Sequence, residues 1–277
     1  MRRPQLEEDL RRALENEELW IAYQPITEAR SGKLIGVEAL ARWEHPTLGP
    51  ISPVEFIPIA EDSGLITQLG DRILKMACRQ AAAWRAHCSA LSNLRLSVNL
   101  STAQLSDPAL CGGVLATLAD AALPPVALCL EITESMLVAD PEKAVLVLRD
   151  LHEAGVHLAI DDFGTGYSSL AYLRRFPVAE LKIDRSFVSS MNESHDDAAI
   201  VENISRLAHA LGLRIVAEGV ETQDQLDELN ELGCDYAQGY LIGHPAAATE
   251  ALHMFDRLAR AHEALALSTV GSSEADH

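Results

Sequence analysis

The chain has little cysteine, and its cysteines are poorly placed for the structures that cysteines usually build. The thiols are five in number and widely spaced, without a Cys-x-x-Cys pair, at Cys78, Cys88, Cys111, Cys129 and Cys234. A disulfide framework needs an even set, and a zinc site needs closely spaced ligands. We therefore expect reduced thiols that are buried as small apolar side chains, and neither disulfides nor zinc.

Long uncharged apolar runs are also absent. The first residues, Met1 to Asp9, include acids where a secretory signal would have a continuous apolar segment. No later stretch is long and uncharged enough to span a bilayer. We expect a cytoplasmic protein that does not insert into membranes.

Basic residues are scarce, because 22 Lys and Arg stand against 41 Asp and Glu, for a formal net charge of −19. A surface of this charge repels the phosphates of polymeric nucleic acid, which we exclude as a partner. A small anionic ligand remains compatible if cations gather at one place. Part of the acidity is then expected where a metal ion can use it.

Alternating apolar residues predict eight strands, with amphipathic helices between most of them. The strands are expected at 19–26, 34–43, 94–101, 127–133, 156–162, 179–184, 213–219 and 236–242. The helices are expected near 64–88, 141–154, 195–211, 222–232 and 247–264. This alternation predicts an α/β fold, a TIM-like (β/α)8 barrel. The link 27–33 is too short for a crossover helix, so the first strand should pair antiparallel with the second and make the barrel irregular.

The two ends of the chain carry different patterns. Leu6, Leu10 and Leu14 recur at helical spacing among charges, so residues 1–18 are expected to form a helix packed on the barrel. Residues 265–277 end in a polar, small-residue segment that we expect to be disordered. No internal linker is visible, so residues 1–264 are expected to form one barrel domain.

Polar residues recur on one face of seven strands, near the carboxyl end of each. In the second strand, Glu38 and Arg42 lie opposite an aliphatic face of Ile35, Val37, Ala39 and Ala41. The same alternation places further polar residues opposite the aliphatic faces of their strands: Asn99, Glu131, Asp161, Lys182, Glu218 and Gln238. In a barrel the aliphatic face meets the helices, so these polar groups should converge on the axis near the strand ends.

The acids and amide among them suit a hard metal ion. Glu38, Asn99, Glu131 and Asp161 offer only oxygen ligands, which favour Mg²⁺ or Mn²⁺ over zinc. Asp162 follows Asp161 directly and could share a second ion, and paired metals about 3.5–4 Å apart are common in phosphoester hydrolysis. Metal charge would also explain how so acidic a protein holds a phosphate.

A glycine-containing run, 164–169, follows the two aspartates. It imitates part of a dinucleotide-binding fingerprint but lacks the third glycine. We interpret it instead as a mobile loop over the metals, because glycines and hydroxyl side chains permit unusual backbone positions.

The ordered set of these motifs resembles the EAL family of cyclic di-GMP phosphodiesterases over roughly residues 5 to 262. The family takes its name from the tripeptide Glu38-Ala39-Leu40. The resemblance is carried by Tyr23-Gln24-Pro25-Ile26, Glu38-Ala39-Leu40-Ala41-Arg42-Trp43, Phe56 to Glu61, Ser97 to Ser101, Glu131 to Glu134, Asp161 to Leu170, Leu181 to Asp184, Ala217 to Glu221 and Gln238 to Tyr240.

This resemblance implies that metal-activated water hydrolyses cyclic di-GMP to linear pGpG, with two ions of Mg²⁺ or Mn²⁺ in the site. It assigns Glu38, Asn99, Glu131 and Asp161 to one ion, and Asp162 with Glu218 to a second. Glu218 is alternatively the general base. Lys182 would orient or help activate the water, and Glu134 would anchor the loop after Asp162. The resemblance further implies that Gln24, Arg42 and Gln238 contact the nucleotide. It also implies that Glu221 supports the site from the loop after the strand that carries Glu218.

Two alternatives stand beside this interpretation. Some EAL domains bind cyclic di-GMP without cleaving it, so the chain could be a catalytically inactive receptor. A different barrel metalloenzyme acting on a small carbon acid would also place carboxylates at strand ends, but it leaves Arg42 and the loop unexplained. After Gln238 to Leu241, many family members have an aromatic and then a basic residue before Pro, whereas this chain has Ile242-Gly243-His244-Pro245. Family resemblance also implies a homodimer formed around the Asp162 loop.

Overall fold

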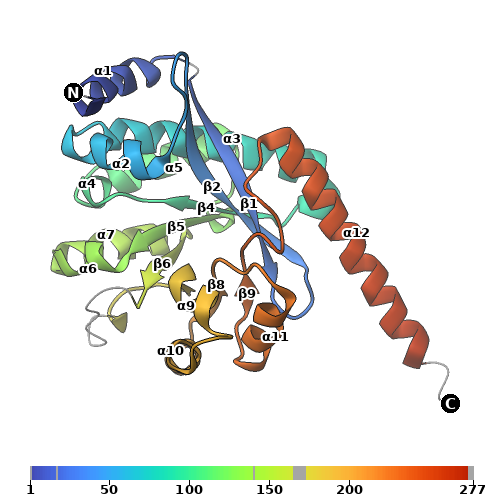
Figure 1. Ribbon diagram of the computed structural model, residues 1–277. Helices are drawn as coiled ribbons and strands as arrows, with labels where there is room; N and C mark the ends of the chain where they lie inside the picture. Colours follow the sequence, from blue (N-terminus) through green and yellow to red (C-terminus); the bar gives the residue numbers. More distant parts are fainter. Residues whose placement is uncertain (1, 17, 140, 165–172, 274–277) are drawn as a thin grey trace.

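The computed structural model describes residues 2–16, 18–139, 141–164 and 173–273. Eight strands pair in the order β1-β9-β8-β7-β6-β5-β4-β2 (Figure 1). The barrel is closed because β2 also pairs with β1, and the short strand β3 pairs with the outer end of β2. The strands are β1 Leu19–Glu28, β2 Leu34–His45, β3 Gly49–Ile51, β4 Arg95–Asn99, β5 Leu128–Thr133, β6 His157–Phe163, β7 Glu180–Ile183, β8 Arg214–Ala217 and β9 Tyr236–Ala237.

The first strand runs against its neighbours, as the short link predicted. β1 is antiparallel to β2 and to β9, whereas the pairs from β2 through β4 to β9 are parallel. Gly32 closes the β1–β2 turn with φ of 68°, a left-handed conformation that glycine adopts without strain. The predicted irregular TIM-like barrel is confirmed.

Helices surround the barrel on the outside (Figure 1). Their bounds are α1 Arg2–Ala13, α2 Pro53–Asp62, α3 Ile66–His87, α4 Thr102–Leu105, α5 Leu110–Ala121, α6 Glu134–Ala139, α7 Pro141–Glu153, α9 Arg185–Ser190, α10 His195–Ala210, α11 Gln223–Glu231 and α12 Ala248–Ser273. The sequence did not predict α5, whose Gly112 and Gly113 weaken the helical signal. α5 packs against α3 and α7, so tertiary burial stabilises it.

The first helix, α1, packs on its neighbour α2, and the last helix, α12, extends past the predicted domain boundary at residue 264. α1 buries Leu6 and Leu10 and packs against α2, and its buried Asp9 lies 3.3 Å from Nε2 of His45 in β2. α12 continues to Ser273, nine residues into the segment that we expected to be disordered. Ala264 to Leu267 have high helix propensity and can extend an existing helix at little cost. Residues 274–277 lie outside the described residues, and the domain boundary at 264 stays a prediction.

The predicted direction of Ile35 is wrong. The β1–β2 register shifts after Ile26, which pairs with Gly36, whereas Thr27 pairs with Leu34. Ile35 is therefore an extra residue in β2, and a β-bulge of this kind reverses the alternation of side chains. It packs on a small cluster inside the barrel, separate from the main core, of Ile26, Val216 and Tyr236.

The main core lies between the outer face of the sheet and the helices. Val37, Leu96, Leu130 and Ile160, from neighbouring strands, are all buried there. The five cysteines are free thiols, and burial raises the pKa of Cys78 to about 12. No helix in the described part of the chain is long and apolar enough to cross a membrane.

Candidate active site

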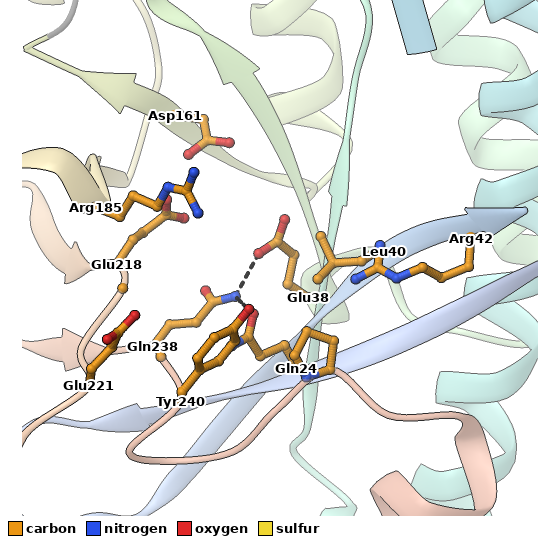
Figure 2. A pocket seen from close by; sticks show the side chains of 13 residues that line it. Gln24, Glu38, Leu40, Arg42, Asp161, Arg185, Glu218, Glu221, Gln238 and Tyr240 are labelled. Atoms are coloured by element: carbon orange, nitrogen blue, oxygen red, sulfur yellow. Dashed lines mark hydrogen bonds between the residues drawn. The ribbon is translucent and has the colours of Figure 1, made fainter. Parts of the chain in front are cut away.

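The predicted polar residues do converge at the carboxyl ends of the barrel strands. A cavity of about 300 Å³ opens there, and seven of them line it: Gln24, Glu38, Arg42, Asp161, Glu218, Glu221 and Gln238. Figure 2 shows Glu38 near the middle of this pocket, with Glu218 and Glu221 on one side and Arg42 on the other. Strand parity therefore placed Glu38, Arg42, Asp161, Glu218 and Gln238 on the side of the pocket, whereas Gln24 and Glu221 came from the family resemblance.

Lys182 lies at the centre of the acidic residues and is about 1% exposed. Its Nζ atom lies within ion-pair distance of four carboxylates: 2.6 Å from Oε1 of Glu218, 2.7 Å from Oε2 of Glu131, 3.2 Å from Oδ1 of Asp161 and 3.6 Å from Oε2 of Glu38. Asp184 is not one of these acids, because its carboxylate caps α9 and accepts from the backbone N–H of Ser186 at 3.0 Å. One ammonium thus faces four acids.

Burial is the largest influence on the pKa values of these carboxyl groups, and neighbouring charges and hydrogen bonds modify it. Burial raises the pKa of Glu218 to about 8 and that of Glu131 well above its ordinary value, although Lys182 opposes both shifts. Burial also raises the pKa of Glu38, but Lys182 and hydrogen bonds from Gln238 and Asn99 outweigh it, so the net shift is downward. Burial lowers the pKa of Lys182, and the surrounding acids reverse this, so the ammonium stays charged.

This excess of buried negative charge fits a divalent cation. Four carboxyl groups face one ammonium, and the raised pKa values of Glu218 and Glu131 show that their ionised forms are not fully compensated, which is costly for buried charge. Carboxylate oxygens of Asp161, Asp162 and Glu218 all lie within 4.8 Å of one another, close enough for a single ion. Nδ2 of Asn99 donates to Oε1 of Glu38 at 2.8 Å, which leaves the amide oxygen as its ligand atom. The donor set is oxygen throughout, as Mg²⁺ and Mn²⁺ require.

A backbone irregularity places the two adjacent aspartates on the same side. Alternation along β6 would send Asp161 and Asp162 to opposite faces. The β6–β7 register shifts between Ile160 and Phe163, and Asp162 has φ of 53°, in the left-handed region that aspartate tolerates better than most residues. Burial and the neighbouring Asp161 raise the pKa of Asp162. Sequence adjacency suggested this pairing, but only the bulge achieves it.

Glu134 lies at the start of α6 and reaches the segment after the aspartates. Its Oε2 accepts from the backbone N–H of Gly164 at 3.3 Å, which agrees with an anchoring role at that residue. Within the described ranges, its Oε1 is buried without a hydrogen-bond partner. The remainder of the predicted loop, 165–169, lies outside the described residues.

Two glutamines connect the acids to the pocket wall. Nε2 of Gln238 donates to Oε2 of Glu38 at 2.6 Å and to Oε1 of Gln24 at 3.1 Å, and Gln24 donates to the carbonyl of Gly243 at 3.1 Å (Figure 2). Oε1 of Gln238 is buried and has no hydrogen-bond partner among the residues that the structure describes. Gln238 therefore holds Glu38 directly and Gln24 positions Gln238, which retains one acceptor for a ligand.

Arg42 and Glu221 occupy the more open parts of the pocket. The Arg42 guanidinium donates to the carbonyl of Ala41 at 2.9 Å, and burial lowers its pKa although Glu38 and Tyr240 oppose the shift. Glu221 is exposed, and its backbone N–H donates to Oε1 of Gln225, which also caps α11. Neither side chain belongs to the Lys182 cluster.

Residues 7–245 match the EAL domain. The chain belongs to the EAL-domain family. Among curated relatives, it is 48% identical over 248 residues to MucR of Pseudomonas aeruginosa, a bifunctional diguanylate cyclase/cyclic di-GMP phosphodiesterase; this covers 90% of the chain and 36% of MucR. It is 44% identical over 241 residues to the cyclic di-GMP phosphodiesterase NbdA of the same organism, which covers 87% of the chain and 30% of NbdA. The chain thus spans about a third of the length of these relatives.

Solved EAL structures have the same fold. The PaMucR phosphodiesterase in complex with c-di-GMP matches with a TM-score of 0.86 at 46% identity, covering 89% of this chain and 99% of that one. The EAL enzyme Bd1971, in a form with cAMP and cyclic di-GMP bound, matches with a TM-score of 0.88 at 31% identity, covering 91% and 69%.

Several residues of the EAL-family pocket were missed by sequence reasoning. Leu40, Arg185, Gly219, Gly239, Tyr240 and Pro245 also line the cavity. The ring of Tyr240 stacks on His244, with centroids 4.1 Å apart and an interplanar angle of 25°, so the unusual His244 lies beside the pocket mouth. The available signal for Arg185 was a cation two residues after β7, at the start of α9, because the carboxyl ends of parallel strands face the pocket.

Proposed function

We propose that the chain is a metal-dependent phosphodiesterase that hydrolyses cyclic di-GMP to linear pGpG. The observation that carries this proposal is the buried set of four carboxylates around Lys182, which opens into a pocket lined by Arg42. The names of the EAL relatives MucR and NbdA support the substrate. The dinucleotide carries two phosphodiesters, and the site must bind one of them close to its acids.

We assign Glu38, Asn99, Glu131 and Asp161 to one ion of Mg²⁺ or Mn²⁺, and Asp162 with Glu218 to a second. Bound ions would supply positive charge that polarises the phosphoryl group and lowers the pKa of water. Two roles for Glu218 follow from its contacts: its place beside Asp161 and Asp162 supports metal binding, and its 2.6 Å contact with Lys182 supports a general base held beside the ammonium.

The other residues bind and orient. Lys182 would hold the attacking water in line with phosphorus, and Gln24, Arg42 and Gln238 would bind the nucleotide. Glu134 would anchor the segment after Asp162 through Gly164, and Glu221 would support the pocket from the loop after β8. Water adds its oxygen to phosphorus while the bond to one ribose 3′-oxygen breaks, and that oxygen takes a proton.

The test is an assay of the purified protein with Mg²⁺ and cyclic di-GMP, in which nucleotides are resolved chromatographically. We expect stoichiometric conversion to pGpG, and loss of conversion in Glu131→Gln, which removes one buried charge with little change of shape. Glu231→Gln, on the exposed end of α11, is the control. Binding without conversion would instead identify the receptor alternative, and neither binding nor conversion would refute both.

Three further expectations stay predictions. We propose one barrel domain over residues 1–264, a cytoplasmic location, and a homodimer formed around the Asp162 region. The dimer rests on family resemblance, and light scattering that finds only monomer with and without cyclic di-GMP would contradict it.

A further inference from the structure

Arg185 is a cation of the active-site pocket that the roles above leave unused. It is the first residue of α9, three positions after Lys182, and its side chain lines the same cavity as Asp161 and Glu218. Figure 2 shows it on the side of these two acids, whereas Arg42 lies on the opposite side, beyond Glu38 and Leu40. The pocket therefore has an arginine on each of two facing walls.

The Arg185 side chain has no hydrogen bond or ion pair with any residue in the described part of the chain, although it is surrounded by acids. A guanidinium carries five N–H donors in a planar fork that matches the oxygens of a phosphate. One N–H group of the Arg42 guanidinium donates to the backbone carbonyl of Ala41, which leaves its other donors for a ligand. Both arginines can therefore offer donors to an anion in the pocket.

Gly219 provides the space that Arg185 occupies. Gly219 follows Glu218, has φ of 72°, and a Cβ atom added to it would lie 2.5 Å from Cβ of Arg185 and 3.2 Å from its Cα. The start of α9 thus packs directly on the backbone that carries Glu218. This close contact fixes the root of the Arg185 side chain at the wall beside the acids.

We propose that Arg185 is a substrate-binding residue whose guanidinium holds the phosphodiester that lies against Asp161 and Glu218, while Arg42 binds across the pocket. The inference rests on the proposed function and adds one recognition element to it. Cyclic di-GMP has two phosphodiesters, and two arginines on facing walls give each charge a partner. The same guanidinium then faces the 5′-phosphate monoester of the product, which carries more charge than the diester.

The experiment compares Arg185→Ala, Arg185→Lys and Arg42→Ala with the unchanged protein. Dissociation constants for cyclic di-GMP are measured with Ca²⁺ in place of Mg²⁺, with chromatography of each sample to verify that the nucleotide is intact, and KM and kcat are measured with Mg²⁺. Arg206→Ala, an exposed arginine of α10 paired with Glu202, is the matched control for loss of one positive charge.

We expect Arg185→Ala to raise both the dissociation constant and KM by about ten- to a hundredfold, the range for a lost charge-assisted hydrogen bond. Arg185→Lys should recover part of this, and the half-saturating Mg²⁺ concentration should stay within about twofold because Arg185 is no ligand. Unchanged affinity and KM in Arg185→Ala, or a shift in metal requirement alone, would overturn the inference while leaving hydrolysis intact. If the unchanged protein neither binds nor cleaves cyclic di-GMP, the inference and the proposed function both fail.

Discussion

At the scale of the residue, Lys182 is central to the charge balance of the site. In the part of the chain that the structure describes, Lys182 is the one ammonium within ion-pair distance of these four carboxylates, so its removal leaves them without a cationic partner. Breaking a buried ion pair in this way costs about 3–5 kcal/mol. We therefore expect removal of Lys182 to destabilise the metal-free protein.

We therefore predict two separable effects of Lys182→Ala. With saturating Mg²⁺, kcat should fall on the order of a hundredfold or more while KM changes little, because positioning of water matters mainly in the transition state. Without metal, the melting temperature should fall, and Mg²⁺ should restore much of the loss. Kinetics and thermal unfolding are measured on the same preparation. Normal turnover by the folded, metal-loaded variant would show that Lys182 is only structural.

A second prediction at this scale is that Glu218 makes the stability of the protein depend on pH. Its pKa is raised from 4.5 in the unfolded chain to about 8 in the fold, so the folded state keeps a proton that the unfolded state has lost. The stability that Glu218 contributes is fully present below about pH 4.5 and is lost as pH rises to about 8. In metal-free protein, Glu218→Gln should therefore flatten the decline in unfolding free energy across this window. Urea unfolding at several pH values measures it, and identical slopes in both proteins would contradict the assignment.

At the scale of the element, the loops after β8 and β9 hold the site by direct backbone contact. A Cβ atom at Gly239 would lie 2.1 Å from the carbonyl oxygen of Val220 and 2.2 Å from its backbone nitrogen. The backbone of Gln238 also accepts from the N–H of Val220 at 3.0 Å. These loops carry Glu218 and Gln238, so their spacing determines the width of the pocket.

Two glycine-to-alanine substitutions should therefore change the stability of the protein in opposite directions. Gly239→Ala must push the two loops apart, and we expect a lower melting temperature together with a higher KM. Gly112→Ala lies within α5, where nothing stands within 4 Å of the added methyl group, so it should stabilise the protein by about 0.5–1 kcal/mol with activity unchanged. Unfolding and kinetics of the pair provide the comparison. A neutral Gly239→Ala would mean that the loops can separate freely.

At the scale of the whole molecule, the net charge of −19 makes recognition of an anion depend on local cations. Among the described residues that line the pocket, Arg42 and Arg185 are the cations, and a bound metal ion would add further positive charge. The rest of the surface repels it, so high salt should weaken this repulsion as well as the attraction in the pocket. Activity is therefore expected to follow occupancy of the metal site more closely than ionic strength.

We predict that Mg²⁺ or Mn²⁺ supports turnover and that Ca²⁺ does not. Ca²⁺ is larger and accepts more ligands at longer distances, so it would bind the acids but misplace the attacking water. Initial rates are measured after chelation and after addition of each ion, with thermal unfolding as an independent measure of binding. All three ions should raise the melting temperature. Comparable rates with Ca²⁺ would contradict the two-metal geometry.

The sequence by itself determined the barrel, its antiparallel first strand and the side of each strand that carries Glu38, Asn99, Glu131, Asp161 and Lys182. It could do so because hydrophobic alternation is a local property, and a one-residue change of register would bury the wrong face. The family motifs then narrowed the chemistry to phosphodiester hydrolysis. The prediction failed at Ile35 and at α5, where a bulge or a tertiary contact overrides the local pattern.

Only the tertiary structure decided how these side chains meet. The Asp161–Asp162 pairing needs the β6 bulge, the four ion pairs of Lys182 need five strands at a common height, and Arg185 needs the missing side chain of Gly219. None of these is visible in a single segment, because each depends on the register between strands or on a close approach of two loops. Strand periodicity gives the direction of a side chain, whereas barrel closure gives its partners.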